Sequence, residues 1–148
     1  MTISCTLTGH RVLRDLDYAL MDRVILNLIK NGCTRFMCGM AMGFDLAAAE
    51  SIIALKKRYA VELVACIPCE NQSDVLFNSD RIRYSRILEN CSEIIVLSEN
   101  YYNGCMQARD RFMVDNSDIV LCYLRKKSGG TYYTVSYAQD KDKKIIEL

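Results

Sequence analysis

The sequence predicts an α/β fold of three layers, in which a mainly parallel sheet of about six strands has helices on both faces. Two observations predict it. Six short apolar runs recur along the chain, and their nearly continuous apolar character is typical of strands buried on both faces of a parallel sheet. Helical stretches separate these runs, and this alternation implies right-handed crossovers. The length of 148 residues predicts one domain, 1–148.

The expected elements follow one another in regular order. Strands are expected where β-branched and apolar residues gather, at 2–7, 35–38, 61–67, 93–98, 118–124 and 144–148. Helices are expected between them, at 14–31, 44–60, 79–91 and 105–116. The first helix carries an apolar stripe that includes Leu16, Leu20 and Val24, and we expect Asp45 to be the N-cap of the second.

One segment has conflicting signals. Residues 131–138, TYYTVSYA, are rich in β-branched and aromatic residues, so local propensity favours a strand. The order of the elements instead requires a helix here, because two parallel strands need a crossover of this length. We therefore predict a helix over 131–140.

The composition excludes several classes of protein. The formal net charge is +1, so no overall field attracts nucleic acid or an anionic membrane. No apolar run approaches the roughly 18 residues of a membrane span, and no basic region precedes an apolar stretch at the N-terminus, so we expect no secretion signal. The eight cysteines lie mostly in apolar runs, as expected for reduced thiols in a cytoplasmic protein.

Cys66 and Cys69 have the spacing of a redox or zinc-binding pair. A redox pair gains its low thiol pKa at a helix N-terminus, whereas these two residues end an expected strand with no immediate helix after it. We therefore favour packing in the core and the following loop over redox or zinc chemistry. The sequence offers no metal cluster, and we expect neither a metal nor a cofactor.

Glycines mark one edge of the predicted sheet. In an open parallel sheet, ligands bind at the carboxyl ends of the strands. Five of the seven glycines follow expected strands, namely Gly9, Gly39, Gly43, Gly129 and Gly130. Because the topology brings these loops to one edge, they predict a ligand site there.

The glycine-rich corner at 128–131 has two readings. Glycine lets the backbone approach a ligand closely, and Thr131 is expected to open a helix whose free N–H groups favour an anion. Gly39 and Gly43 precede the helix at 44–60 in the same way, so both corners suit a phosphorylated ligand such as a nucleotide. Both also fit ordinary strand-to-helix turns, and they match neither a Walker A loop nor a complete G-x-G-x-x-G motif.

Charged and aromatic residues add further candidates. Arg109 lies early in an expected helix near the sheet edge and can reach an anion, whereas Arg111 and Asp115 are spaced for a surface ion pair. His10 is the single histidine, and a structural or exposed role fits it better than a catalytic one. The aromatic residues that can stack on a base, or cover a sheet edge or a dimer contact, are Tyr101, Tyr102, Tyr132 and Tyr133.

Several segments together resemble the YpsA-like branch of the SLOG superfamily. They are TGHR (8–11), GMAMGFDLAAAE (39–50), IPCENQ (67–72), ARDRFMVDNSDIVLCYL (108–124) and SGGTYYTVSYA (128–138). The family's members are Rossmann-like proteins related to the LOG nucleotide phosphoribohydrolases and to the core of DprA. The resemblance covers essentially the whole chain, and it implies a Rossmann-like fold with a nucleotide or nucleotide-derived ligand at the sheet edge.

The resemblance and the loops together give a set of expected ligand-binding residues. They are Thr8, Gly9, His10, Arg11, Gly39, Met40, Gly43, Asp45, Arg109, Ser128, Gly129, Gly130, Thr131 and Thr134. In LOG-type hydrolases an arginine followed four residues later by Met contributes to catalysis, and Arg109 and Met113 keep that spacing. Arg109 is therefore the candidate catalytic residue. Those enzymes also carry a glutamate three residues after the threonine of a PGGxGTxxE motif, but here the motif is shortened to SGGT and Thr134 holds that position.

Three functions follow, in order of preference. The first is a cytoplasmic protein that binds a nucleotide or nucleotide-derived small molecule, to sense or sequester it. The alternative is an enzyme that cleaves the N-glycosidic bond of a nucleotide, where general acid–base catalysis typically contributes about 10²–10⁴-fold and Thr134 cannot replace a carboxylate. DprA-like binding of nucleic acid ranks last, because the chain has no basic excess. No membrane partner is expected, and a homo-oligomer is left open.

Overall fold

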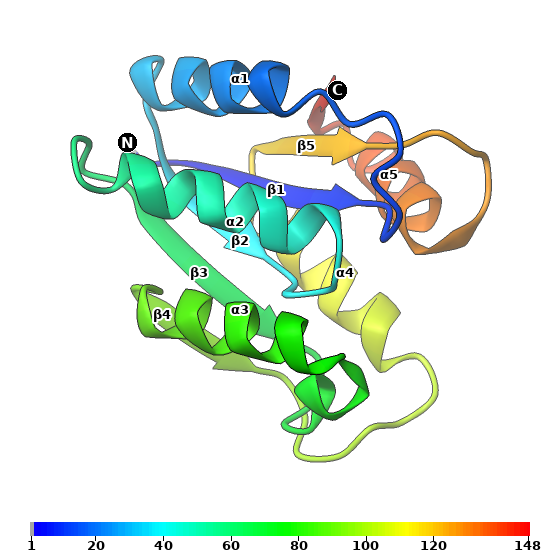
Figure 1. Cartoon of the computed structure of the whole chain (residues 1–148). Helices are drawn as coiled ribbons and strands as arrows, with labels where there is room; N and C mark the ends of the chain where they lie inside the picture. Colours follow the sequence, from blue (N-terminus) through cyan, green and yellow to red (C-terminus); the bar gives the residue numbers. More distant parts are fainter. Residues whose placement is uncertain (1) are drawn as a thin grey trace.

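The computed structural model describes residues 2–148 and contains one six-stranded sheet between two layers of helices (Figure 1). The strands are β1 (Ile3–Gly9), β2 (Cys33–Cys38), β3 (Glu62–Ile67), β4 (Glu93–Val96), β5 (Ile119–Tyr123) and β6 (Lys144–Glu147). The helices are α1 (Tyr18–Lys30), α2 (Phe44–Leu55), α3 (Asn78–Glu89), α4 (Cys105–Asp115) and α5 (Gly129–Asp140), with a short 3-10 helix at Gln72–Val75.

The sheet order is β4-β3-β2-β1-β5-β6, and every neighbouring pair is parallel. Helices α1, α2 and α3 lie on one face, and α4 and α5 lie on the other (Figure 1). The prediction of a mainly parallel sheet with helices on both faces is confirmed. The predicted helix over 131–140 is also confirmed, because α5 is the crossover between β5 and β6.

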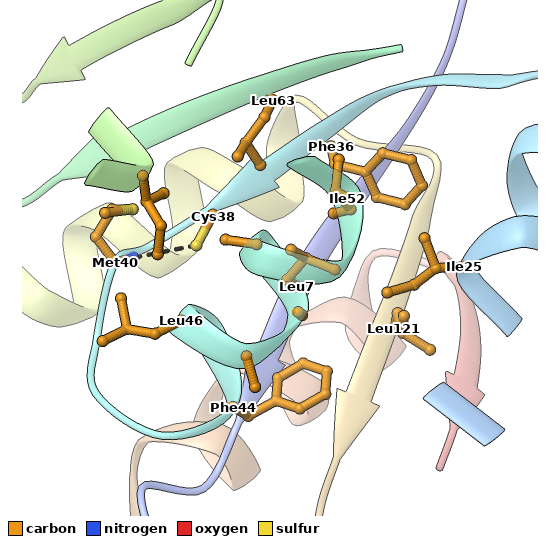
Figure 2. Close-up of a cluster of buried hydrophobic side chains, with 14 of the residues drawn as sticks. Leu7, Ile25, Phe36, Cys38, Met40, Phe44, Leu46, Ile52, Leu63 and Leu121 are labelled. Carbon is orange, nitrogen blue, oxygen red and sulfur yellow. Dashed lines mark hydrogen bonds between the residues drawn. The ribbon is translucent and has the colours of Figure 1, made fainter. Parts of the chain in front are cut away.

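The core between the sheet and the first helical layer is built from strand centres and from α2. Figure 2 shows Leu7, Phe36, Leu63 and Leu121 of the sheet meeting Ile25, Phe44, Leu46 and Ile52 of the helices. Helix α2 also buries three consecutive alanines, 47–49, which let the helix lie close to the sheet. A helix that is apolar on most sides belongs at the centre of its layer, and α2 lies between α1 and α3.

Helix α1 starts later than the sequence predicts. It begins at Tyr18 because Asp17 caps it, accepting the Leu20 N–H at 3.0 Å. Residues 14–17 therefore belong to the loop that follows β1, although Leu16 still packs in the core. This shift places Arg14 and Asp15 near the carboxyl edge of the sheet.

The strand order fixes where a ligand site can form. Strand β1 is followed in sequence by β2 on one side of it, while β5 lies on its other side. The crossovers thus diverge between the carboxyl ends of β1 and β5, which is the switch point where open parallel sheets bind their ligands. Over residues 2–148, the helices are all too short or too polar to cross a membrane.

Candidate functional site

A pocket of about 880 Å³ opens at this switch point, between the loops that follow β1, β2 and β5 and the start of α4. Ten of the fourteen expected site residues line it: Thr8, Gly9, His10, Arg11, Gly39, Asp45, Arg109, Gly129, Gly130 and Thr131. The structure thus brings together the loops that the sequence placed at one edge.

The other four expected residues do not line the pocket. Met40 is buried in the core, where its N–H donates to the Cys38 sulfur (Figure 2). Gly43 and Ser128 are the N-cap residues of α2 and α5. The Thr134 hydroxyl donates to the Gly130 carbonyl at 2.9 Å, one turn earlier in α5. These four residues shape the backbone that surrounds the pocket.

Two predicted helix starts are wrong. Asp45 lies in the first turn of α2 and is not its N-cap; the cap is Gly43, whose φ of +85° favours glycine. A Cβ on Gly43 would also lie 2.4 Å from the Arg11 carbonyl oxygen. Helix α5 begins at Gly129, so Thr131 lies inside its first turn and does not open it.

Arg109 is buried in the wall of the pocket, with only 6% of its surface exposed. Its Nη1 donates to the Gly39 carbonyl at 2.6 Å, and its Nε donates to Asp110 at 2.7 Å. Burial alone would lower the pKa of Arg109, but the carboxylates of Asp110 and Asp45 raise it, so the guanidinium stays charged. Arg109 therefore ties the β2 loop to α4 and holds a charged guanidinium, paired with Asp110, in the pocket wall.

Gly39 is the reason that Arg109 fits. A Cβ at position 39 would lie 2.7 Å from Nη1 and 2.9 Å from Cζ of Arg109. Those separations are well inside normal contact distance. The glycine thus leaves the space that the guanidinium occupies, and its own carbonyl accepts one of the guanidinium hydrogen bonds.

Two carboxyl groups flank the guanidinium. Burial raises the pKa of Asp45 to about 7, although Arg109 and the Ala41 N–H, 3.2 Å from Oδ2, act in the opposite direction. Burial also raises the pKa of Asp110, while Arg109, whose Nε donates to this carboxylate, opposes the rise. Asp45 lies where a proton can be gained or lost near neutral pH, which is the property that acid–base chemistry requires.

The first turn of α5 faces the same pocket with no side chain capping it. Ser128 occupies the N-cap position, but its hydroxyl makes no capping hydrogen bond. The N–H groups of Gly129, Gly130 and Thr131 lack partners within the helix, as at every α-helix start. The helix dipole adds partial positive charge at this end. The arrangement favours an anion beside Gly130, where a Cβ would meet nothing within 4 Å.

Basic side chains form the rim. Arg11, Arg14 and Lys126 line the pocket, and within residues 2–148 they make no ion pair or side-chain hydrogen bond. Arg125 is different, because it bonds Asp15 at 3.0 Å and lies over the Tyr123 ring, 4.4 Å from its centroid. Three cations are thus available to an anionic ligand.

His10 has a structural place in this rim. Its Nε2 accepts the Arg125 N–H at 2.8 Å, and its ring lies edge-on to Tyr123. Burial is the largest cause that lowers the pKa of His10, and Lys126 and Arg125 add to it. The neutral ring therefore joins the loops after β1 and β5.

The predicted surface ion pair of Arg111 with Asp115 is wrong. Arg111 Nη1 donates to the Tyr133 hydroxyl at 2.8 Å, and Asp115 accepts the Tyr137 hydroxyl at 2.8 Å. Both partners lie on α5, because α4 and α5 pack side by side and their tyrosines reach across. The two polar contacts join the helices of the second layer.

Cys66 and Cys69 are both buried free thiols. Cys66 packs in a cluster with Met37, Val64 and Met113, and burial raises its pKa to about 12. Such a thiol is a weak nucleophile at neutral pH. This environment agrees with the packing role that the sequence favoured for Cys66.

Several lining residues were missed by the sequence analysis. Arg14 and Asp15 were assigned to a helix, and Arg125 and Lys126 precede the loop that was expected after the fifth strand. Asp110 follows Arg109 directly on α4, and that adjacency is the one signal that could have found it. The site is therefore more strongly charged than the glycine-rich loops alone suggested.

Comparison with known proteins agrees with this architecture. The model of the YpsA family, described as the YspA SLOG family, matches residues 10–147. UPF0398 protein lwe1908 of Listeria welshimeri is 31% identical over 125 residues, covering 78% of this chain and 69% of the relative. The uncharacterized SPbeta prophage-derived protein YoqJ of Bacillus subtilis is 26% identical over 140 residues, covering 86% and 80%.

Two solved structures share the fold. DNA processing protein A of Helicobacter pylori, whose single-stranded DNA binding mode has been described, superposes with a TM-score of 0.73 at 21% identity. This chain is covered to 99% and spans 65% of that protein. DprA of Streptococcus pneumoniae has a TM-score of 0.71 at 20% identity, with 98% of this chain and 50% of that protein covered. At these identities the likeness concerns the fold.

Proposed function

Because the chain belongs to the YpsA family of SLOG proteins, we propose that it binds a nucleotide or nucleotide-derived small molecule in the pocket between β1 and β5. One observation carries the proposal: the N-terminus of α5, which has no side-chain cap, and basic side chains that are unpaired within residues 2–148 line the same pocket. The first turn of α5 offers free N–H groups, and Arg11, Arg14 and Lys126 line the same pocket. These are the groups that recognise phosphate in proteins.

The proposed site has room for more than a phosphate. Its volume of about 880 Å³ falls in the range of small-molecule pockets. Leu7, Val12, Met106 and Met113 contribute apolar lining beside the charged groups. A ligand with an anionic end at α5 and an apolar or aromatic end against these side chains would match both parts, as a nucleotide does.

The compartment belongs to the same proposal. All eight cysteines are free thiols, a state that is maintained in reducing compartments. We therefore propose that the protein binds its ligand in the cytoplasm.

Calorimetric titration against nucleotides, ADP-ribose-type ligands and inorganic phosphate tests the proposal. Gly130→Val should abolish binding, because a branched side chain would enter the open space before the α5 N-terminus. Lys126→Ala should weaken binding by up to about tenfold, which corresponds to ~1.4 kcal/mol. Lys127→Ala is the matched control, since Lys127 follows in the same loop outside the pocket lining. Equal binding by wild type and Gly130→Val would show that this corner is an ordinary turn.

Cleavage of an N-glycosidic bond is the second candidate, and the carboxyls of the pocket favour it. The sequence places no glutamate at position 134, but the structure brings Asp110 of α4 beside the Thr134 hydroxyl. Asp45 supplies a second buried carboxyl whose pKa is about 7. A general acid with such a pKa suits protonation of a leaving base at neutral pH.

Chromatography of nucleoside monophosphates after incubation with the protein separates the two candidates. Release of a free base that is lost in Asp45→Asn and Asp110→Asn, with nucleotide affinity retained, would establish the hydrolase. Binding without base release would leave the protein as a sensor or sequestering protein. DNA binding stays the third proposal, because the DprA structures are related to this chain through their fold.

A further inference from the structure

Strand β4 is a bare edge of the sheet. It pairs only with β3 and has no neighbour on its other side among the described residues. Ile94 is 47% exposed and Val96 is 43% exposed, whereas Ile95 points to the opposite face and packs near Met113. The strand therefore presents two large apolar side chains to solvent beside an open main-chain edge.

The main-chain geometry shows which groups face outward. The Leu97 N–H donates to the Ile67 carbonyl of β3 at 2.9 Å. Because successive residues of a strand direct their main-chain groups to opposite sides, the N–H and C=O of Val96 and Ile94 point away from β3. The outward-facing groups thus belong to the same two residues whose side chains are exposed.

The opposite edge of the sheet is covered differently. On β6, both Ile145 and Ile146 pack against core clusters. Protein edges that stay unpaired are usually protected by lysine, proline or a bulge, but residues 93–97, EIIVL, contain neither lysine nor proline. The β4 edge lacks this protection.

Further exposed apolar side chains lie on α3 and directly before it. Helix α3 lies over β4 in Figure 1, and it exposes 60% of Ile82. Phe77, directly before the helix, is 77% exposed. Exposed apolar side chains gathered in one region mark an interaction surface more often than scattered ones do.

We propose that the β4 edge is the interface with a second copy of this chain, joined by antiparallel pairing of the two β4 strands. A twofold axis through Ile95 sets Ile94 of each copy opposite Val96 of the other. Both residues carry outward main-chain groups, so they form hydrogen-bonded pairs on either side of the axis. The two sheets continue into one, and the axis, normal to the sheet, places both α3 helices on the same face of it.

The charges on this edge suit a second copy. Glu93 is the one charged residue of β4, and its carboxylate is paired with Arg35 of its own chain at 3.1 Å. In the proposed register, Glu93 lies opposite Leu97 of the second copy and away from the second Glu93. Within the two paired strands no like charges lie opposite one another, and a closed twofold pairing leaves neither β4 edge open.

Sedimentation velocity over a range of protein concentrations tests the pairing. We expect a concentration-dependent dimer for the wild-type chain and a monomer for Val96→Pro and Ile94→Lys. Proline at 96 removes an N–H that makes no hydrogen bond to β3, and lysine at 94 places a charge in the proposed strand-to-strand interface. Tyr18→Lys is the control: Tyr18 is 52% exposed at the start of α1, so this variant should keep the wild-type dimer.

A second measurement keeps the test decisive if a variant folds poorly. Amide hydrogen exchange of the β4 peptide in the wild-type chain should slow as protein concentration rises, while exchange of the β6 peptide should not change. A wild-type chain that stays monomeric at its highest soluble concentration would overturn the proposal. A dimer that persists in well-folded Val96→Pro and Ile94→Lys would place the interface elsewhere and overturn it equally.

Discussion

Gly39→Ala probes the contact that joins β2 to α4. The new Cβ would lie 2.7 Å from Nη1 and 2.9 Å from Cζ of Arg109, so the guanidinium must move. That movement is costly because the side chain is 6% exposed and held at both ends, by the Gly39 carbonyl at 2.6 Å and by Asp110 at 2.7 Å. Losing one charge-assisted hydrogen bond typically costs about 1.5–3 kcal/mol.

The assay is reversible unfolding by urea and by heat. For a chain of this size, 1 kcal/mol corresponds to a change in Tm of roughly 2–4 °C, so Gly39→Ala should lower Tm by roughly 3–12 °C. Gly130→Ala is the matched control in the same pocket, because its Cβ meets nothing within 4 Å and stability should be unchanged or slightly higher.

A double-mutant cycle isolates the cause. If the clash with the guanidinium is responsible, Gly39→Ala should cost much less in an Arg109→Ala background, since the obstructing group is gone. Equal stability of Gly39→Ala and wild type would refute the reasoning. An undiminished loss in the Arg109→Ala background would refute it as well, by showing that the backbone at position 39 is the sensitive part.

Three further predictions concern other buried groups. The pKa of Asp45 is about 7 in the folded protein, above its unfolded value of 3.8, so the folded state binds more protons between these two pH values. The free energy of unfolding should therefore fall as pH rises from about 4 to about 7. Urea unfolding of Asp45→Asn should show a weaker decline over the same pH range. The Thr6 hydroxyl donates to the Met113 carbonyl and lies 2.6 Å from the Ser117 hydroxyl. Thr6→Val should therefore cost about 1–3 kcal/mol, measured by urea unfolding, whereas the exposed Thr34→Val should be nearly neutral. Cys69→Ser should keep the fold and nucleotide binding, and stoichiometric zinc in the purified wild-type protein would contradict the packing role of this thiol.

The sequence was sufficient for the central strands because burial on both faces produces continuous apolar runs, whereas the edge strands β4 and β6 are shorter and partly exposed. Segments such as VELVACI and DIVLCYL carry continuous apolar character, and the six parallel strands lie where these runs are. For the segment at 131–138, local propensity favoured a strand, but the crossover requirement prevailed. A helix here depends on the neighbouring strands more than on its own residues.

The sequence predicts the edge at which the pocket opens, but only part of the pocket's lining. Glycines reveal where the backbone bends, and four of the five that follow expected strands line the pocket at the predicted edge. The charged lining was harder to predict, because side-chain direction depends on packing. Asp110 and Arg109 are adjacent on α4, and both reach the pocket. The predicted helix at 14–31 followed an apolar stripe and began before the Asp17 cap, so Arg14 was assigned to the helix and not to the pocket.

The pairing of β1 with β5 also sets the order in which the molecule can assemble. Cys5 lies beside Ile119, so the two strands that frame the pocket are separated by most of the chain. During synthesis the segment from β1 to β3, with its helices, emerges first and can pack together. At that stage the edge of β1 that later pairs with β5 has no partner. The pocket forms only when β5 and the start of α5 have left the ribosome. A ligand of this pocket, as proposed above, would therefore meet a nearly complete chain: it would stabilise the finished fold by mass action and would find no complete site on the earlier intermediates.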